Sequence, residues 1–121
     1  MKPIPYNSAI KIVNSHELIF KQCVAQIAKD LDLEEDWYTK KASDLDELYN
    51  ELFPIIQYKL EVSASGFQQL LYRIDIDETL LQKELSSGAH SDLTSMLTGL
   101  IIEREVKKVI TRNVLSGKLD V

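Results

Sequence analysis

Apolar residues recur along most of the chain at the spacing of an α-helix, and the longest such segment runs from Asp92 to Leu115. It contains no proline and one glycine. In its first half the apolar residues share one face, as the 3.6-residue period requires. The apolar face then moves to the opposite side of the helix, where its members are Ile102, Val106, Val109 and Ile110. The pattern predicts one long helix, over about residues 91–115, with two apolar faces end to end.

Two arrangements would cover both faces of this helix. In the first, the helix lies at the centre of a bundle and has neighbours on different sides of its two halves. In the second, its C-terminal half projects past its own core and pairs with a second copy, because a contiguous exposed apolar stripe usually has a partner. The second arrangement predicts a homodimer with the candidate interface Ile102, Val106, Val109 and Ile110.

The sequence of residues 1–31 predicts an extended arm followed by a helix. Residues 1–9 hold two of the three prolines and are expected to be extended. A helix then begins between Ala9 and Ser15 and continues to Leu31. Asn14 opens a capping-box pattern, in which side chains satisfy the first backbone N–H groups of a helix.

A second long helix is predicted from a continuous apolar stripe between Leu45 and Leu60. Ser43 lies in the position of its N-cap. Pro54 falls on the opposite side of the stripe, where a proline removes one hydrogen bond and predicts a kink. A break after Leu52 is the alternative.

Two short helices, Phe67–Ile74 and Glu78–Leu85, are predicted before Gly88 ends the second of them. No stretch alternates apolar and polar residues with β-branched enrichment, as a strand would. The predicted fold is therefore an all-α, single-domain bundle over residues 1–121. It has about five helices, three long and two short, and no sheet.

Composition narrows the class of protein further. The 121 residues are 45% hydrophobic and 27% charged, which is typical of one globular domain. No segment approaches the eighteen or so apolar residues of a membrane span, and the first residues lack the apolar core of a signal peptide. We expect a soluble, cytoplasmic protein that does not bind a membrane. Cys23 is the single cysteine and lies on an apolar stripe, so we expect a buried thiol.

Charge is unevenly distributed along the chain, whose formal net charge is −5. Between Asp30 and Glu51 there are nine acidic residues and two lysines, whereas between Glu103 and Lys118 there are five basic residues and two acidic ones. Nucleic-acid binding depends on Lys and Arg that neutralise phosphates. An acidic first half therefore predicts no nucleic-acid partner.

The predicted linker over residues 33–42 contains the candidate partner-binding residues. It carries an acidic run followed by two aromatic residues, and its candidates are Glu34, Glu35, Asp36, Trp37 and Tyr38. Trp37 either packs over the end of the bundle with its indole N–H pointing outward, or anchors a partner that the acidic residues attract.

No motif predicts catalysis. The chain lacks a glycine-rich phosphate loop, a nucleophile elbow and paired Cys or His residues at metal-ligand spacing. Neither His16 nor His90 has a Glu three residues before it, as a di-metal bundle requires. Glu103 and Glu105 are two apart and cannot share a helix face. We therefore predict no catalytic, cofactor-binding or metal-binding residues, and no enzyme.

These patterns favour a protein-interaction or structural module that self-associates through its C-terminal helix. The alternative is an acidic inhibitor or immunity-type protein that binds a basic protein partner through the linker. An enzyme or a ligand carrier would need a buried polar pocket that the sequence does not indicate.

Overall fold

In the computed structural model, the described residues are 6–76, 78–87 and 92–119. Across these ranges the chain forms six α-helices and no strand, which confirms the all-α prediction. One helix more than predicted is present because the first predicted helix is divided in two.

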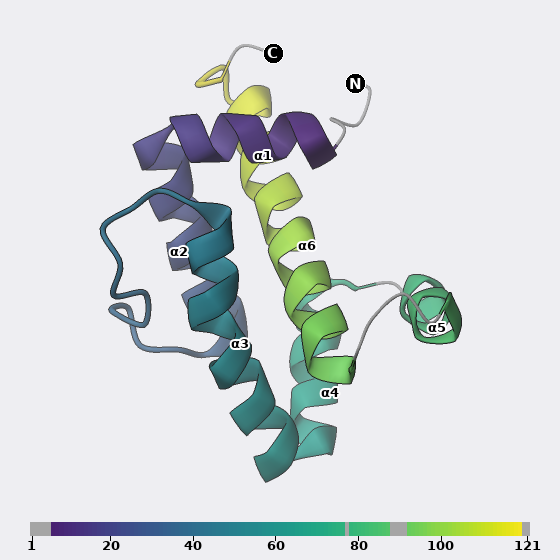
Figure 1. The fold of residues 1–121 in the computed structure, drawn as a ribbon. Helices are drawn as coiled ribbons and strands as arrows, with labels where there is room; N and C mark the ends of the chain where they lie inside the picture. Colours follow the sequence, from purple (N-terminus) through teal and green to yellow (C-terminus); the bar gives the residue numbers. More distant parts are fainter. Residues whose placement is uncertain (1–5, 77, 88–91, 120–121) are drawn as a thin grey trace.

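The long helix α6 (Leu93–Leu115) is the central element (Figure 1). It contacts α1 (Tyr6–Ser15), α2 (Glu17–Leu31) and α3 (Leu45–Val62). In Figure 1, α1 crosses the upper end of α6, while α2 and α3 lie along one side of it. α6 therefore meets neighbours from several directions, as a central helix of a bundle must.

The predicted extended arm is wrong for residues 6–9, which belong to α1, and residues 1–5 lie outside the described residues. Ala9 and Val13 are fully buried, so the apolar spacing continues further back than the prolines suggested. In the last turn of α1 the Ser15 hydroxyl donates to the carbonyl oxygen of Lys11 at 2.7 Å.

His16 separates α1 from α2 and has an extended backbone conformation. Its carbonyl oxygen accepts the first hydrogen bond of α2, from the N–H of Phe20 at 2.9 Å. Its side chain is exposed and forms no cap. The chain changes direction at this residue, which sets α1 across α6 and α2 alongside it (Figure 1).

The start of α3 is capped twice. Asp44 is the N-cap, one residue after the predicted Ser43, and its side chain accepts from the N–H of Asp46 at 2.9 Å. Asn14 accepts from the N–H of Leu45 at 3.0 Å, so it caps α3 and not the helix that follows it in sequence. The helix continues through the exposed Pro54, which excludes the predicted alternative of a break after Leu52.

Two shorter helices connect α3 to α6. α4 (Ala64–Ile74) begins directly after Ser63, whose hydroxyl accepts from the N–H of Gly66 at 3.1 Å. α5 (Glu78–Ser87) follows and contacts α6. α6 begins at the N-cap Asp92, and Gly117, with a φ of 76°, follows its last turn.

The core lies where α1, α2 and α3 meet α6. The four residues predicted as a dimer interface all belong to this core and are at most 3% exposed: Ile102, Val106, Val109 and Ile110. Helices of the same chain cover both apolar faces of α6, as the first of the two arrangements requires. The exposed stripe on which the dimer hypothesis depends is absent, because α1, α2 and α3 pack around this helix.

Candidate functional site: a cavity between α2 and the linker

The linker of residues 32–44 leaves the end of α2 and turns back over that helix (Figure 1). Asp32 has a left-handed conformation, with a φ of 56°, which Asp tolerates better than most residues. The N–H of Leu33 then donates to the carbonyl oxygen of Ala28 at 2.8 Å. This C-cap ends α2 and reverses the chain direction.

Trp37 attaches the linker to α2. Its indole N–H donates to the carbonyl oxygen of Val24 at 3.0 Å, and its half-buried ring packs against the core. The indole N–H thus points toward the helix, whereas the lid interpretation expected it to point outward. Trp37 fixes the path of the linker over α2.

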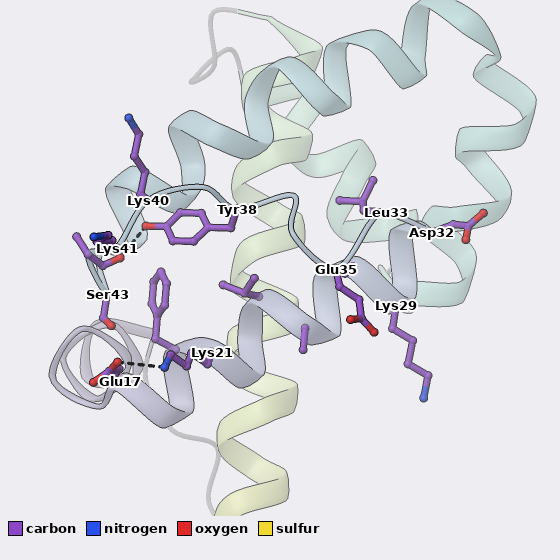
Figure 2. Close-up of a pocket in the computed structure, with 15 residues that line it drawn as sticks. Glu17, Lys21, Lys29, Asp32, Leu33, Glu35, Tyr38, Lys40, Lys41 and Ser43 are labelled. Carbon is purple, nitrogen blue, oxygen red and sulfur yellow. Dashed lines mark hydrogen bonds and ion pairs between the residues drawn. The ribbon is translucent and has the colours of Figure 1, made fainter.

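Tyr38 forms one wall of the space beneath the linker. Its ring meets Phe20 of α2 edge to face, with 5.4 Å between ring centroids, and its hydroxyl donates to the carbonyl oxygen of Ala42 at 2.7 Å (Figure 2). Partial burial raises the pKa of this hydroxyl, and the nearby carboxylates of Glu47, Asp44 and Glu51 raise it further. Tyr38 therefore stays protonated and keeps this hydrogen bond at neutral pH.

Between α2 and the linker lies a cavity of about 840 Å³ (Figure 2). Its apolar lining comes from one face of α2 and from the linker, and consists of Phe20, Val24, Ala25, Ala28, Leu33, Tyr38 and Ala42. Its rim carries exposed charged side chains of both signs, namely Glu17, Lys21, Lys29, Asp32, Glu35, Lys40 and Lys41. The cavity is therefore an open groove with an apolar floor and a charged rim.

The structure brings together some of the predicted partner-binding residues. Tyr38 and Glu35 line the cavity. Glu34 and Asp36 are exposed on the linker but are not part of the lining, and Trp37 lies on the core side. Sequence reasoning missed the apolar face of α2, because Ala25 and Ala28 become a floor only once the linker folds back over them.

A second polar arrangement, which the sequence did not indicate, joins α2 to α6. Three side chains spaced four residues apart on α2 each pair with a side chain of α6, and the distances run from 2.7 to 3.0 Å. The pairs are Gln22 with Asn113, Gln26 with Arg112, and Asp30 with Lys108. The residue numbers rise along α2 as they fall along α6, so these two helices are antiparallel.

Glu105 lies in the same contact and is fully buried. Burial raises the pKa of its carboxyl group to about 8, and the neighbouring Asp30 adds to this shift. Burial alone would also raise the pKa of Asp30, but its interactions with Glu105, Lys108 and Gln26 hold it below its ordinary value. The thiol of Cys23 is also affected, because burial, followed by the negative charge of Glu105, raises its pKa to about 12.

These two carboxyl groups do not form a site for a substrate or a metal ion. Asp30 is 6% exposed and Glu105 is 0% exposed, so neither reaches the cavity or the surface enough to bind a substrate. Among the described residues, no group of three or more His, Cys, Asp or Glu side chains is placed to hold a metal ion.

Comparison of the chain with protein-family models, with curated proteins and with solved structures found no match. Among the helices that the structure describes, none is long and apolar enough to cross a membrane.

Proposed function

We propose that this chain is a protein-interaction module, and that the cavity between α2 and the linker receives an apolar side chain from a short segment of a protein partner. The observation that carries the proposal is the cavity itself. Its volume of about 840 Å³ falls within the range of roughly 300–1,000 Å³ that is common for binding pockets. Its floor is one face of a regular helix, so it is formed before a partner arrives.

The rim favours a protein segment over an enclosed small molecule. A site for a small molecule usually surrounds its ligand and offers a few polar groups in fixed positions. Here the charged residues around the cavity are all exposed. Within the described part of the chain, Lys29, Lys40 and Lys41 make no ion pair, so they are free to pair with a partner. An apolar centre with a solvated charged rim is typical of protein interfaces.

Tyr38 supplies the aromatic contact that such interfaces often use. Its ring is held by Phe20 on one side and by the hydrogen bond to Ala42 on the other. A partner would therefore meet a side chain that has already lost most of its freedom, which lowers the entropic cost of binding.

The experiment is selection of binding peptides from a random library displayed on phage, followed by NMR mapping on the isotope-labelled protein. We expect selected peptides to shift the backbone amide signals of Ala25, Ala28 and Leu33. Ala25→Glu introduces a carboxylate into the cavity floor and should weaken peptide binding by about tenfold or more, which corresponds to at least 1.4 kcal/mol. Because Ala25 is exposed, its substitution should leave the melting temperature nearly unchanged.

Gln57→Glu is the matched control, because it adds the same charge at an exposed position of α3 outside the cavity. It should leave peptide binding unchanged. The proposal would be refuted by peptides that shift amide signals on another face of the protein, or by peptides that bind Ala25→Glu as tightly as the wild type.

A second candidate function is capture of a basic protein partner by the outer side of the linker. The observation in its favour is that Glu34, Glu35 and Asp36 are all exposed and adjacent. The same selection separates the two candidates. Basic peptides whose binding falls steeply with added salt, and whose signals map to these three residues, would support the second candidate.

A further inference from the structure

The contact between α2 and α6 contains a carboxyl group without an evident partner. Glu105 is 0% exposed, and neither of its carboxylate oxygens has a hydrogen-bond donor among the described groups. An ionised carboxylate in such a position is strongly unfavourable, because it has lost its water and gained no donor.

The neighbouring charged groups do not offset the cost of burying a negative charge on Glu105. The amine of Lys108 lies 2.8 Å from Asp30 Oδ2 but 3.9 Å from Glu105 Oε2, so its hydrogen bond goes to Asp30. Gln26 also donates to Asp30 Oδ2, at 3.0 Å. Lys108 is therefore the cation beside both carboxyl groups, but it forms its hydrogen bond with Asp30 and leaves Glu105 without one.

We propose that Glu105 keeps its proton in the folded protein at neutral pH and donates it to the carboxylate of Asp30, so that one proton joins α2 to α6. The arrangement is a proton-binding site: two carboxyl groups accept one proton between them and release it as the pH rises. Two carboxylates are both acceptors and cannot hydrogen-bond to each other until one of them carries a proton. The directions of the two pKa shifts agree, since that of Glu105 is raised to about 8 and that of Asp30 is lowered.

The remaining charged and titratable groups near Glu105 do not account for this behaviour. From α2, the thiol of Cys23 has a pKa of about 12 and remains neutral. From α6, Arg104 pairs with Asp75 at 3.4 Å, and Arg112 donates to Gln26 at 3.0 Å. The positive charges of Lys108 and Arg104 favour ionisation of Glu105, but burial outweighs them.

The direction of the pH effect follows from these values. A glutamate in the unfolded chain loses its proton near its ordinary value of 4.5, whereas folded Glu105 keeps its proton up to about 8. The folded state therefore binds one more proton than the unfolded state between these limits. Stability should fall as the pH rises from about 4.5 to about 8 and then level off, with the unfolding equilibrium constant rising by up to about tenfold per pH unit in that window.

The direct test is a pH titration of the wild-type protein by carbon NMR of its side-chain carboxyl groups, with the signal of Glu105 assigned through bonds. We expect this carboxyl group to titrate near 8. This measurement needs no variant, so it holds even if a substituted chain fails to fold. Titration of Glu105 near 4.5 would refute the proposal.

Thermal unfolding across the same pH range provides the second measurement. Glu105→Gln keeps the shape of the side chain but cannot ionise, so it should remove the fall in stability that the wild type shows with rising pH. The matched control is Glu103→Gln on the same helix, because the Glu103 side chain is 35% exposed and pairs with Lys107 at 2.9 Å. This control should keep the fall. Equal pH dependence in the wild type and in Glu105→Gln would contradict the inference.

Discussion

The indole nitrogen of Trp37 and the carbonyl oxygen of Val24 lie 3.0 Å apart, although the two residues are separated by 13 positions in the sequence. This hydrogen bond holds the linker against the helix that precedes it. The cavity beneath the linker exists because the chain doubles back in this way, and Trp37, which is not part of its lining, holds the linker that forms one side of it.

Substitution of Trp37 should separate the effect of its hydrogen bond from that of its ring. Trp37→Phe keeps an aromatic ring beside Tyr38 but removes the N–H donor, so we expect the free energy of unfolding to fall by about 1 kcal/mol. Trp37→Ala also removes the packing and should cost about 2 kcal/mol or more. Urea denaturation followed by circular dichroism measures both changes.

Tyr72→Ala is the control for this pair, because Tyr72 is an aromatic residue that is 85% exposed. Its removal should change the free energy of unfolding by less than about 0.5 kcal/mol. If Trp37→Ala is as harmless as this control, the linker is not held by Trp37.

Val106→Asp tests where the second apolar face of α6 is buried. Val106 is 0% exposed inside one chain, so a carboxylate there should lower the free energy of unfolding by about 4 kcal/mol or more. Leu115→Asp, at a position that is 72% exposed on the same helix, should have little effect. A variant Val106→Asp that remains folded as a monomer, while the wild type sediments as a dimer, would instead restore the interface between two copies.

The thiol of Cys23 should not react in the folded protein. It is 0% exposed and burial raises its pKa to about 12, so almost none of it is the reactive thiolate at neutral pH. We expect a thiol reagent to label Cys23 only as fast as the protein unfolds, and at once in denaturant. Rapid labelling of the native protein would show that the contact between α2 and α6 opens readily.

Features that depend on neighbouring residues were predicted well from the sequence. The extent of α6 is an example, because the spacing of its apolar residues predicts a helix over about residues 91–115, and the structure has it at Leu93–Leu115. The cap that Asn14 provides is different. Its donor, Leu45, lies 31 residues later, and an Asn before a helix gives no indication of such a distant partner.

In the candidate site, too, features set by residues close in sequence could be predicted, and features set by distant residues could not. The burial of Glu105 could have been predicted, because it lies four residues after Ile101 and four before Val109, and both are in the core. Its neighbour Asp30 could not, since the approach of α2 to α6 is a result of tertiary packing. The cavity could not be predicted from the sequence either, because α2 and the linker, which form its two sides, meet only after the linker turns back.

The three polar pairs between α2 and α6 constrain how this sequence can change over time. Sliding one helix past the other by one turn, about 5.4 Å, would separate all three pairs together. A substitution at Gln26 or Arg112 alone leaves a polar group facing the wrong neighbour, whereas an exchange of both can restore the bond. Sequences descended from a common ancestor with this one should therefore vary at these positions in matched pairs, residue 22 with 113, 26 with 112 and 30 with 108.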